Sequence, residues 1–140
     1  MLNYGQNQYL KTQVATVNNL QLVVLLYEGA IKYLRQAEEG IEEKNIEKRN
    51  NNIQRALDII DELKNALNLS QGGEIARSLL ALYLFMNNHL MMANIKNEAG
   101  KIQEVCKMLS TLKEAWQSVA SQPDLKKHIS ESTRPSGIRI

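Results

Sequence analysis

Residues 19–43 read NLQLVVLLYEGAIKYLRQAEEGIEE, and the spacing of their apolar side chains decides the fold class. The apolar positions recur every three or four residues and share one narrow sector of a helical wheel: Val23, Leu26, Tyr27, Ala30, Leu34, Ala37 and Ile41. Asn18 or Asn19 can cap the first turn, because an amide oxygen accepts hydrogen bonds from free backbone N–H groups. The stretch therefore predicts an amphipathic helix that buries one face.

Three further stretches repeat this period and predict helices at about 46–68, 74–96 and 99–121. Their core-facing residues are predicted to be Ile46, Ile53, Ala56, Leu57, Ile60, Leu63 and Leu67, then Ile75, Leu79, Leu82, Tyr83, Met86, Leu90 and Ala93, and finally Ile102, Val105, Cys106, Leu109, Leu112, Trp116 and Val119. Four helices joined by short loops place sequential neighbours antiparallel. The expected fold is therefore all-α, an antiparallel up-down-up-down four-helix bundle.

The connections between these helices have recognisable turn residues. Lys44-Asn45 predicts the first turn, with Asn45 as the cap of the next helix. Ser70-Gln71-Gly72-Gly73 is expected to end the second helix, because glycine accepts the left-handed conformation that follows many helices. Gln122-Pro123 ends the fourth, since the residue before a proline avoids helical geometry. Residues 1–18 then form a polar N-terminal arm, and residues 122–140 a flexible tail.

Composition narrows the possible functions. The chain has 140 residues, 17 of them basic and 15 acidic, which is enough for one domain. Four of the basic and two of the acidic residues lie in the tail, so the other 121 residues hold 13 of each. A charge-balanced body argues against nucleic-acid binding, and no apolar stretch is long enough to span a membrane. The first residues lack a signal-peptide pattern and there is one cysteine, so we expect a cytoplasmic protein.

Two of the predicted helices carry apolar residues outside their core-facing stripes. On the 74–96 helix these residues form a second stripe, Leu80, Leu84, Met91 and Ile95, about 100–160° from the first. On the 19–43 helix they are Leu20, Val24, Leu25 and Ile31. Either the N-terminal arm or a second copy of the chain covers these residues, or they form a groove for an amphipathic segment of another protein, or the core is simply wide.

No set of side chains in the sequence supports catalysis, a metal site or a cofactor. Cys106 lies on a core stripe, which predicts a packed, unreactive thiol. The Glu-x-x-His pairs of di-iron bundles and a phosphate-binding glycine loop are both missing from the sequence. His89, at the edge of the 74–96 stripe, leaves one alternative open, a histidine phosphotransfer or signalling bundle. A structural homodimer is the other alternative.

Several segments, taken together, resemble the FliS family of flagellin-specific secretion chaperones. They are Leu26-Tyr27-Glu28-Gly29-Ala30, Gly72-Gly73-Glu74-Ile75-Ala76, Leu82-Tyr83 with Met86, Ala93-Asn94 and Ala115-Trp116. The similarity runs in unbroken order over about residues 4–121. Two positions depart from the family pattern, Asn18-Asn19 where Ser-Pro is common, and Leu84 within Tyr83-Leu84-Phe85 where the family often has Tyr-Asp-Tyr.

The resemblance implies a cytoplasmic, non-enzymatic chaperone of flagellum biogenesis and type III protein export. Such a protein binds the C-terminal region of flagellin, prevents premature polymerisation and keeps flagellin export-competent. It also implies contacts with the flagellar export apparatus and other flagellar regulators. The N-terminal arm, with Tyr4 and Tyr9, is expected to lie over the binding surface when flagellin is absent. The predicted binding residues are Leu80, Leu84, Met91, Ile95, Leu20, Val24, Leu25 and Ile31.

Overall fold

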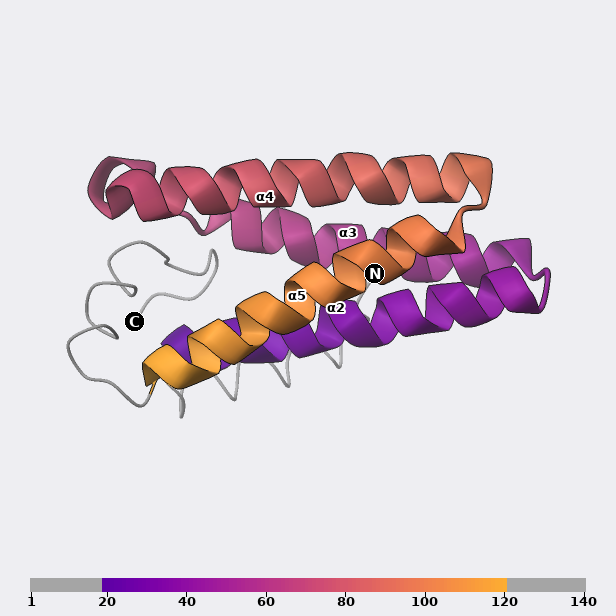
Figure 1. The fold of residues 1–140 in the computed structure, drawn as a ribbon, viewed down its shortest axis with the longest axis horizontal. Coiled ribbons are helices and arrows are strands. Elements are labelled where there is room, and N and C mark those ends of the chain that lie inside the picture. Colours follow the sequence, from indigo (N-terminus) through magenta and orange to yellow (C-terminus); the bar gives the residue numbers. More distant parts are fainter. Residues whose placement is uncertain (1–18, 121–140) are drawn as a thin grey trace.

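Residues 19–120 of the computed structural model form four helices joined by short turns (Figure 1). These helices are α2 (Asn19–Glu42), α3 (Ile46–Asn65), α4 (Leu69–Lys96) and α5 (Ala99–Ala120). No strand occurs in this described part of the chain. The prediction of an all-α bundle is confirmed, and within residues 19–120 no helix is long and apolar enough to cross a membrane.

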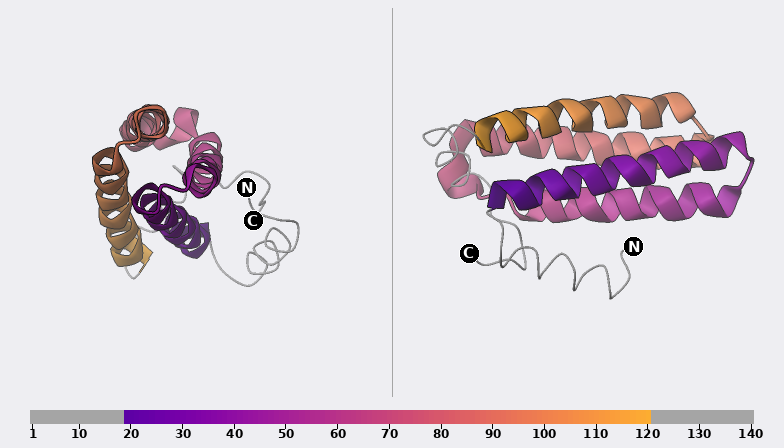
Figure 2. Two further views of the ribbon diagram at one scale, coloured as in Figure 1. Left: turned by 90° about the vertical axis from the view of Figure 1, so that its right-hand side faces the viewer. Right: turned by 90° about the horizontal axis from the view of Figure 1, so that it is seen from below.

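The helices form a ring in which each one packs against two neighbours. Helix α2 contacts α3 and α5, and α4 contacts the same two helices from the other side (Figure 2). Helices α2 and α4 are therefore diagonal partners, which is the up-down-up-down arrangement predicted from the short loops. The turn after α2 and the turn after α4 lie at the same end of the bundle (Figure 1).

One hydrophobic core fills the centre of the ring. The large side chains with almost no exposure come from all four helices: Tyr27, Tyr83, Leu20, Leu22, Leu34, Ile53, Ile60, Leu63, Met86, Leu90, Ile102 and Leu109. Two tyrosines reach across the diagonal, with the Tyr27 and Tyr83 hydroxyl oxygens 2.5 Å apart. The Trp116 side chain of α5 also hydrogen-bonds to Tyr27, and since indole nitrogen can only donate, the Tyr27 oxygen accepts.

Helix ends follow local chemistry. Asn45 caps α3 as predicted, because its side-chain oxygen accepts a hydrogen bond from the Lys48 backbone N–H at 3.0 Å. Asn97 adopts a left-handed conformation with φ of 58° and ends α4. Asparagine tolerates this conformation better than most residues that carry a Cβ.

The connection between α3 and α4 differs from the prediction. Helix α3 ends at Asn65, earlier than the predicted residue 68, and α4 begins at Leu69 in place of residue 74. The Asn68 side chain accepts a hydrogen bond from the Gln71 backbone N–H and so caps an additional helical turn. Gly73, at φ 57° and ψ −135°, interrupts the helical geometry, so the glycine marks a kink inside α4.

Candidate partner-binding surface on helix α4

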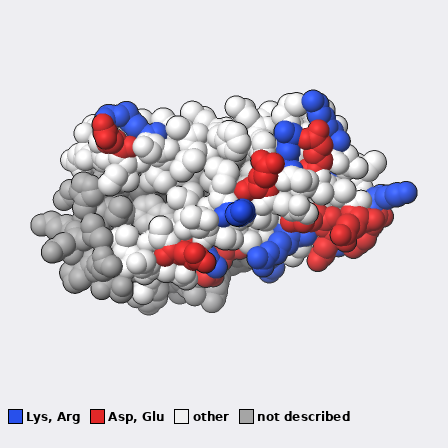
Figure 3. Space-filling model, viewed as in Figure 1, with Lys and Arg blue, Asp and Glu red and all other residues white. Residues whose placement is uncertain are grey.

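Helix α4 contains a long stretch without charge. Between Arg77 and Lys96, residues 78–95 include no Asp, Glu, Lys or Arg. A helix with one face in the core normally places charged residues on its opposite, solvent face. Figure 3 shows charged side chains near the two ends of α4, and only uncharged atoms along the part of the helix between them.

The outer face of this stretch carries several large apolar side chains that are exposed. We define the α4 surface as Leu80, Leu84, Phe85, Met91, Met92 and Ile95. Ile95 is 75% exposed and Leu84 is 46% exposed, whereas Leu80 is half-buried. Exposed apolar side chains that adjoin one another on one face indicate a surface that another molecule covers. The structure thus brings together the four residues predicted on this helix.

The four residues predicted on α2 lie in different surroundings. Leu20 and Ile31 are buried within the hydrophobic core cluster, and Val24 and Leu25 are half-buried. Helix α2 packs against both α3 and α5, so burial extends around more of its circumference than one stripe. Because α2 lies diagonally across the bundle from α4, none of the four belongs to the α4 surface. Tyr4 and Tyr9 of the predicted arm lie outside the described residues.

Two members of the α4 surface were missed by the sequence reasoning. Phe85 and Met92 lie about 100° around the helix from Leu84 and Met91, on the side of His89, which contacts Glu104 of α5. The predicted second stripe, with its spacings of four and seven residues, does not include these two positions. The signal that could identify them is the charge-free run itself, because it places no charged residue on that side of the helix.

His89 lies at the edge of the α4 surface and is held by its neighbours. Its Nε2 atom is 2.7 Å from Oε2 of Glu104 on α5, and its side chain is only 15% exposed. The Phe85 ring stacks on the imidazole with centroids 4.7 Å apart. A phosphorylated histidine needs an accessible ring nitrogen, and here Nε2 is occupied by a carboxylate. This geometry disfavours the phosphotransfer alternative.

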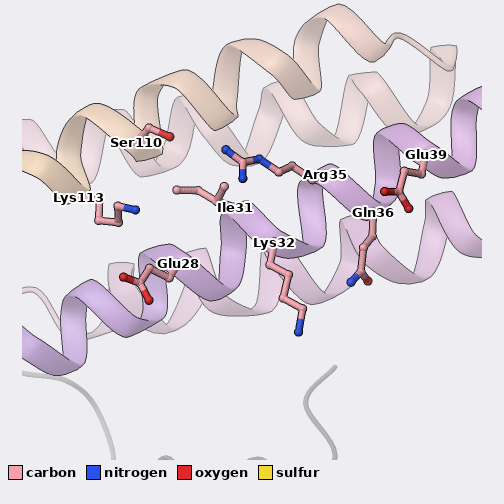
Figure 4. A pocket seen from close by; sticks show the side chains of 8 residues that line it. All are labelled: Glu28, Ile31, Lys32, Arg35, Gln36, Glu39, Ser110 and Lys113. Atoms are coloured by element: carbon pink, nitrogen blue, oxygen red, sulfur yellow. The ribbon is translucent and has the colours of Figure 1, made fainter.

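A second feature is a cavity of about 380 Å³ between α2 and α5. Figure 4 shows Arg35 of α2 and Lys113 of α5 extending toward the space above Ile31. Its complete lining is Glu28, Ile31, Lys32, Arg35, Gln36, Glu39, Ser110 and Lys113. The lining is mostly charged and polar, with Ile31 as its one apolar member, and it contains no histidine or cysteine.

Cys106 matches the prediction of a packed thiol. Its side chain is half-buried against the core. Burial raises the pKa of the Cys106 thiol to about 11, and the carboxylate of Glu38 adds to the shift. The thiol therefore stays protonated near neutral pH and is a poor nucleophile. Within residues 19–120, no group of three or more His, Cys, Asp or Glu side chains is arranged to hold a metal ion.

Comparison with known proteins identifies the family of this four-helix bundle. The sequence model of the family described as "Flagellar protein FliS" matches residues 1–123. The chain belongs to the FliS family. It is 33% identical over 126 residues to the flagellar secretion chaperone FliS of Bacillus subtilis, covering 88% of this chain and 93% of that one. The chaperone of the same name from Salmonella typhimurium is 34% identical over 112 residues, covering 79% and 83% of the two chains.

Membership of the FliS family confirms the resemblance found in the sequence. This is a family of flagellar secretion chaperones and not of enzymes. Leu84, one of the positions at which the sequence departs from the expected family pattern, is exposed on the α4 surface.

Proposed function

We propose that this flagellar secretion chaperone binds the C-terminal segment of flagellin on the α4 surface. The observation that carries the proposal is the exposed, charge-free outer face of α4, residues 78–95. An amphipathic helix of the partner would place its apolar side chains there, which is a recurring mode of peptide recognition. Met91 and Met92 suit such a surface, because flexible thioethers adapt to varied shapes.

The consequences for flagellin follow from mass action. A bound C-terminal segment has its apolar side chains covered, so it is withdrawn from premature polymerisation in the cytoplasm. Binding lowers the concentration of free flagellin without consuming ATP. Ordering a flexible segment costs conformational entropy, so the complex needs a large apolar contact to offset that cost. The same chaperone then keeps flagellin export-competent and hands it to the flagellar export apparatus.

The N-terminal arm has a place in this proposal. The resemblance assigns residues 1–18 a covering role over the binding surface, and Tyr4 and Tyr9 are the two aromatic side chains among them. A segment of the chain that competes with flagellin lowers the apparent affinity for flagellin, because only the molecules with an uncovered surface can bind. Deletion of residues 1–18 should therefore strengthen flagellin binding, and weaker binding would contradict the competing role.

The test of the proposed function is a pair of charge substitutions on the α4 surface. Leu84→Asp and Met91→Asp each place a carboxylate where apolar contact is expected, and each should weaken flagellin binding by about 30-fold or more. Isothermal calorimetry with flagellin measures the affinity, and circular dichroism checks the helix content. Because both side chains are exposed, helix content should not change.

Ile46→Asp is the matched control. Ile46 is 63% exposed at the start of α3, outside the α4 surface, so the same change of chemistry should leave the affinity unchanged. Equal affinity for wild type and both α4 variants would place the flagellin site elsewhere. A wild-type chain that forms a stable dimer, unaffected by flagellin in sedimentation analysis, would favour the structural homodimer over the chaperone groove.

A further inference from the structure

Phe85 is the aromatic member of the α4 surface, and its ring is supported from one side. The ring lies 4.7 Å from the His89 imidazole, measured between centroids, with 27° between the two planes. The two residues are four apart, so both side chains project from the same side of α4. Phe85 nonetheless keeps 46% of its surface exposed. One face is thus packed and the remainder is open to a partner.

The imidazole that supports Phe85 is itself fixed by α5. Nε2 of His89 lies 2.7 Å from Oε2 of Glu104, and the His89 side chain is largely buried. Glu104 reaches it from the neighbouring helix and is 64% exposed. A hydrogen bond to a carboxylate is short and directional, so it fixes the orientation of the ring. The chain of contacts therefore runs from α5 through His89 to the exposed ring of Phe85.

We propose that His89, anchored by Glu104, is a positioning residue that presents Phe85 as a preformed platform for an aromatic or bulky aliphatic side chain of the bound partner. The inference rests on the proposed function, because it concerns the same α4 surface. A ring held in its binding orientation loses less conformational freedom on association, which strengthens binding without adding a contact. Stacked and edge-to-face aromatic pairs also contribute beyond the area that they bury.

Met92 completes the platform on the side that faces α5. It follows Phe85 by seven residues and His89 by three, so the three side chains share one side of α4. Met92 is exposed, and a thioether is suited to contact an aromatic side chain of the partner. The occupant that fits this arrangement is an apolar side chain of the partner helix, seated on the Phe85 ring beside the Met92 sulfur.

The experiment measures flagellin affinity in a double-mutant cycle between Glu104 and Phe85. Glu104→Ala should weaken binding about 3- to 10-fold, and Phe85→Ala about 10-fold or more. Glu104→Ala should have no further effect once Phe85 is alanine, because the anchor then has no platform to hold. Glu104→Gln keeps an acceptor for the imidazole and should restore most of the affinity.

Glu114→Ala is the control, since Glu114 is another exposed carboxylate of α5. Its affinity should equal that of wild type. The inference is overturned if Glu104→Ala binds as tightly as Glu114→Ala, or if it weakens binding equally with and without Phe85, which would indicate a direct contact with flagellin. In both cases the wild-type complex still forms and the proposed function stands. A wild-type chain that does not bind flagellin contradicts the proposed function instead, and the platform with it.

Discussion

Helices α2 and α4 are the two most apolar helices of the bundle, yet they use their apolar residues differently. Helix α2 buries ten of its apolar side chains and packs closely against α3. A Cβ added at Gly40 of α2 would lie 2.7 Å from the Arg49 backbone nitrogen. Helix α4 buries one face and leaves Leu84, Met91 and Ile95 exposed. Apolar content alone therefore does not separate a core helix from a binding helix; the neighbours of each face do.

The largest expected effect on stability tests this contrast with one substitution in each helix. Leu34 of α2 is fully buried, so Leu34→Ala should lower the free energy of unfolding by about 2–5 kcal/mol through lost burial and the cavity left behind. Leu84→Ala removes the same atoms from an exposed position of α4 and should change the free energy of unfolding by less than about 0.5 kcal/mol. Urea denaturation monitored by circular dichroism measures both. Equal losses would mean that Leu84 is part of the core.

The close packing between α2 and α3 predicts the next largest effect on stability. Gly40→Ala forces a methyl group against the α3 backbone, which side-chain rotation cannot relieve, so we expect a loss of about 1–3 kcal/mol. Gly100 of α5 has open space around its Cα, and Gly100→Ala should be neutral or stabilise the protein by up to about 1 kcal/mol. Thermal unfolding of the two variants distinguishes them. A neutral Gly40→Ala would show that α2 shifts freely on α3.

The hydroxyl pair that links α2 to α4 provides the third test. Tyr83→Phe leaves the Tyr27 hydroxyl with its bond to Trp116, and should cost about 1–2 kcal/mol. Tyr27→Phe leaves both the Tyr83 hydroxyl and the Trp116 N–H without that partner, so it should cost more. Burial also raises the pKa of both tyrosines, which favours the protonated hydroxyls in the fold. The order of the two unfolding midpoints in urea checks the prediction; a reversed order would contradict it.

Most of the fold could be predicted from the sequence because the helix period is a strong local signal. The stripe from Val23 to Ala37 is buried in the structure, and the Asn45 cap forms as expected. The start of α4 was less predictable. Gly72-Gly73 favours a helix end by propensity, but Asn68 caps an additional turn and the glycine serves as a kink within the helix. The Asn68 cap and the two glycines therefore give opposite signals within six residues, and the sequence pattern alone does not show which of them determines the start of the helix.

The candidate site was predictable on α4 and much less so on α2. A second stripe on α4 follows directly from the wheel, and in the structure Leu84, Met91 and Ile95 are exposed while Leu80 is half-buried. The flank of α2 has the same apolar character, but Leu20 and Ile31 are buried. Which flank a neighbouring helix covers depends on the rotation of each helix in the ring, and that is a tertiary property. Equally, nothing in the local sequence pairs His89 with Glu104, fifteen residues away on α5.

The smallest expected effect concerns the outer end of the α4 surface. Ile95 is the most exposed of its residues, and Ile95→Gln should change the free energy of unfolding by less than about 0.5 kcal/mol, because little burial is lost. The same variant removes an apolar side chain from the proposed contact with flagellin and should weaken that complex measurably in calorimetry. A matched loss of stability and affinity would make Ile95 a structural residue of α4. Unchanged stability with reduced affinity instead separates the binding face of α4 from its core face, which is the distinction that α2 lacks.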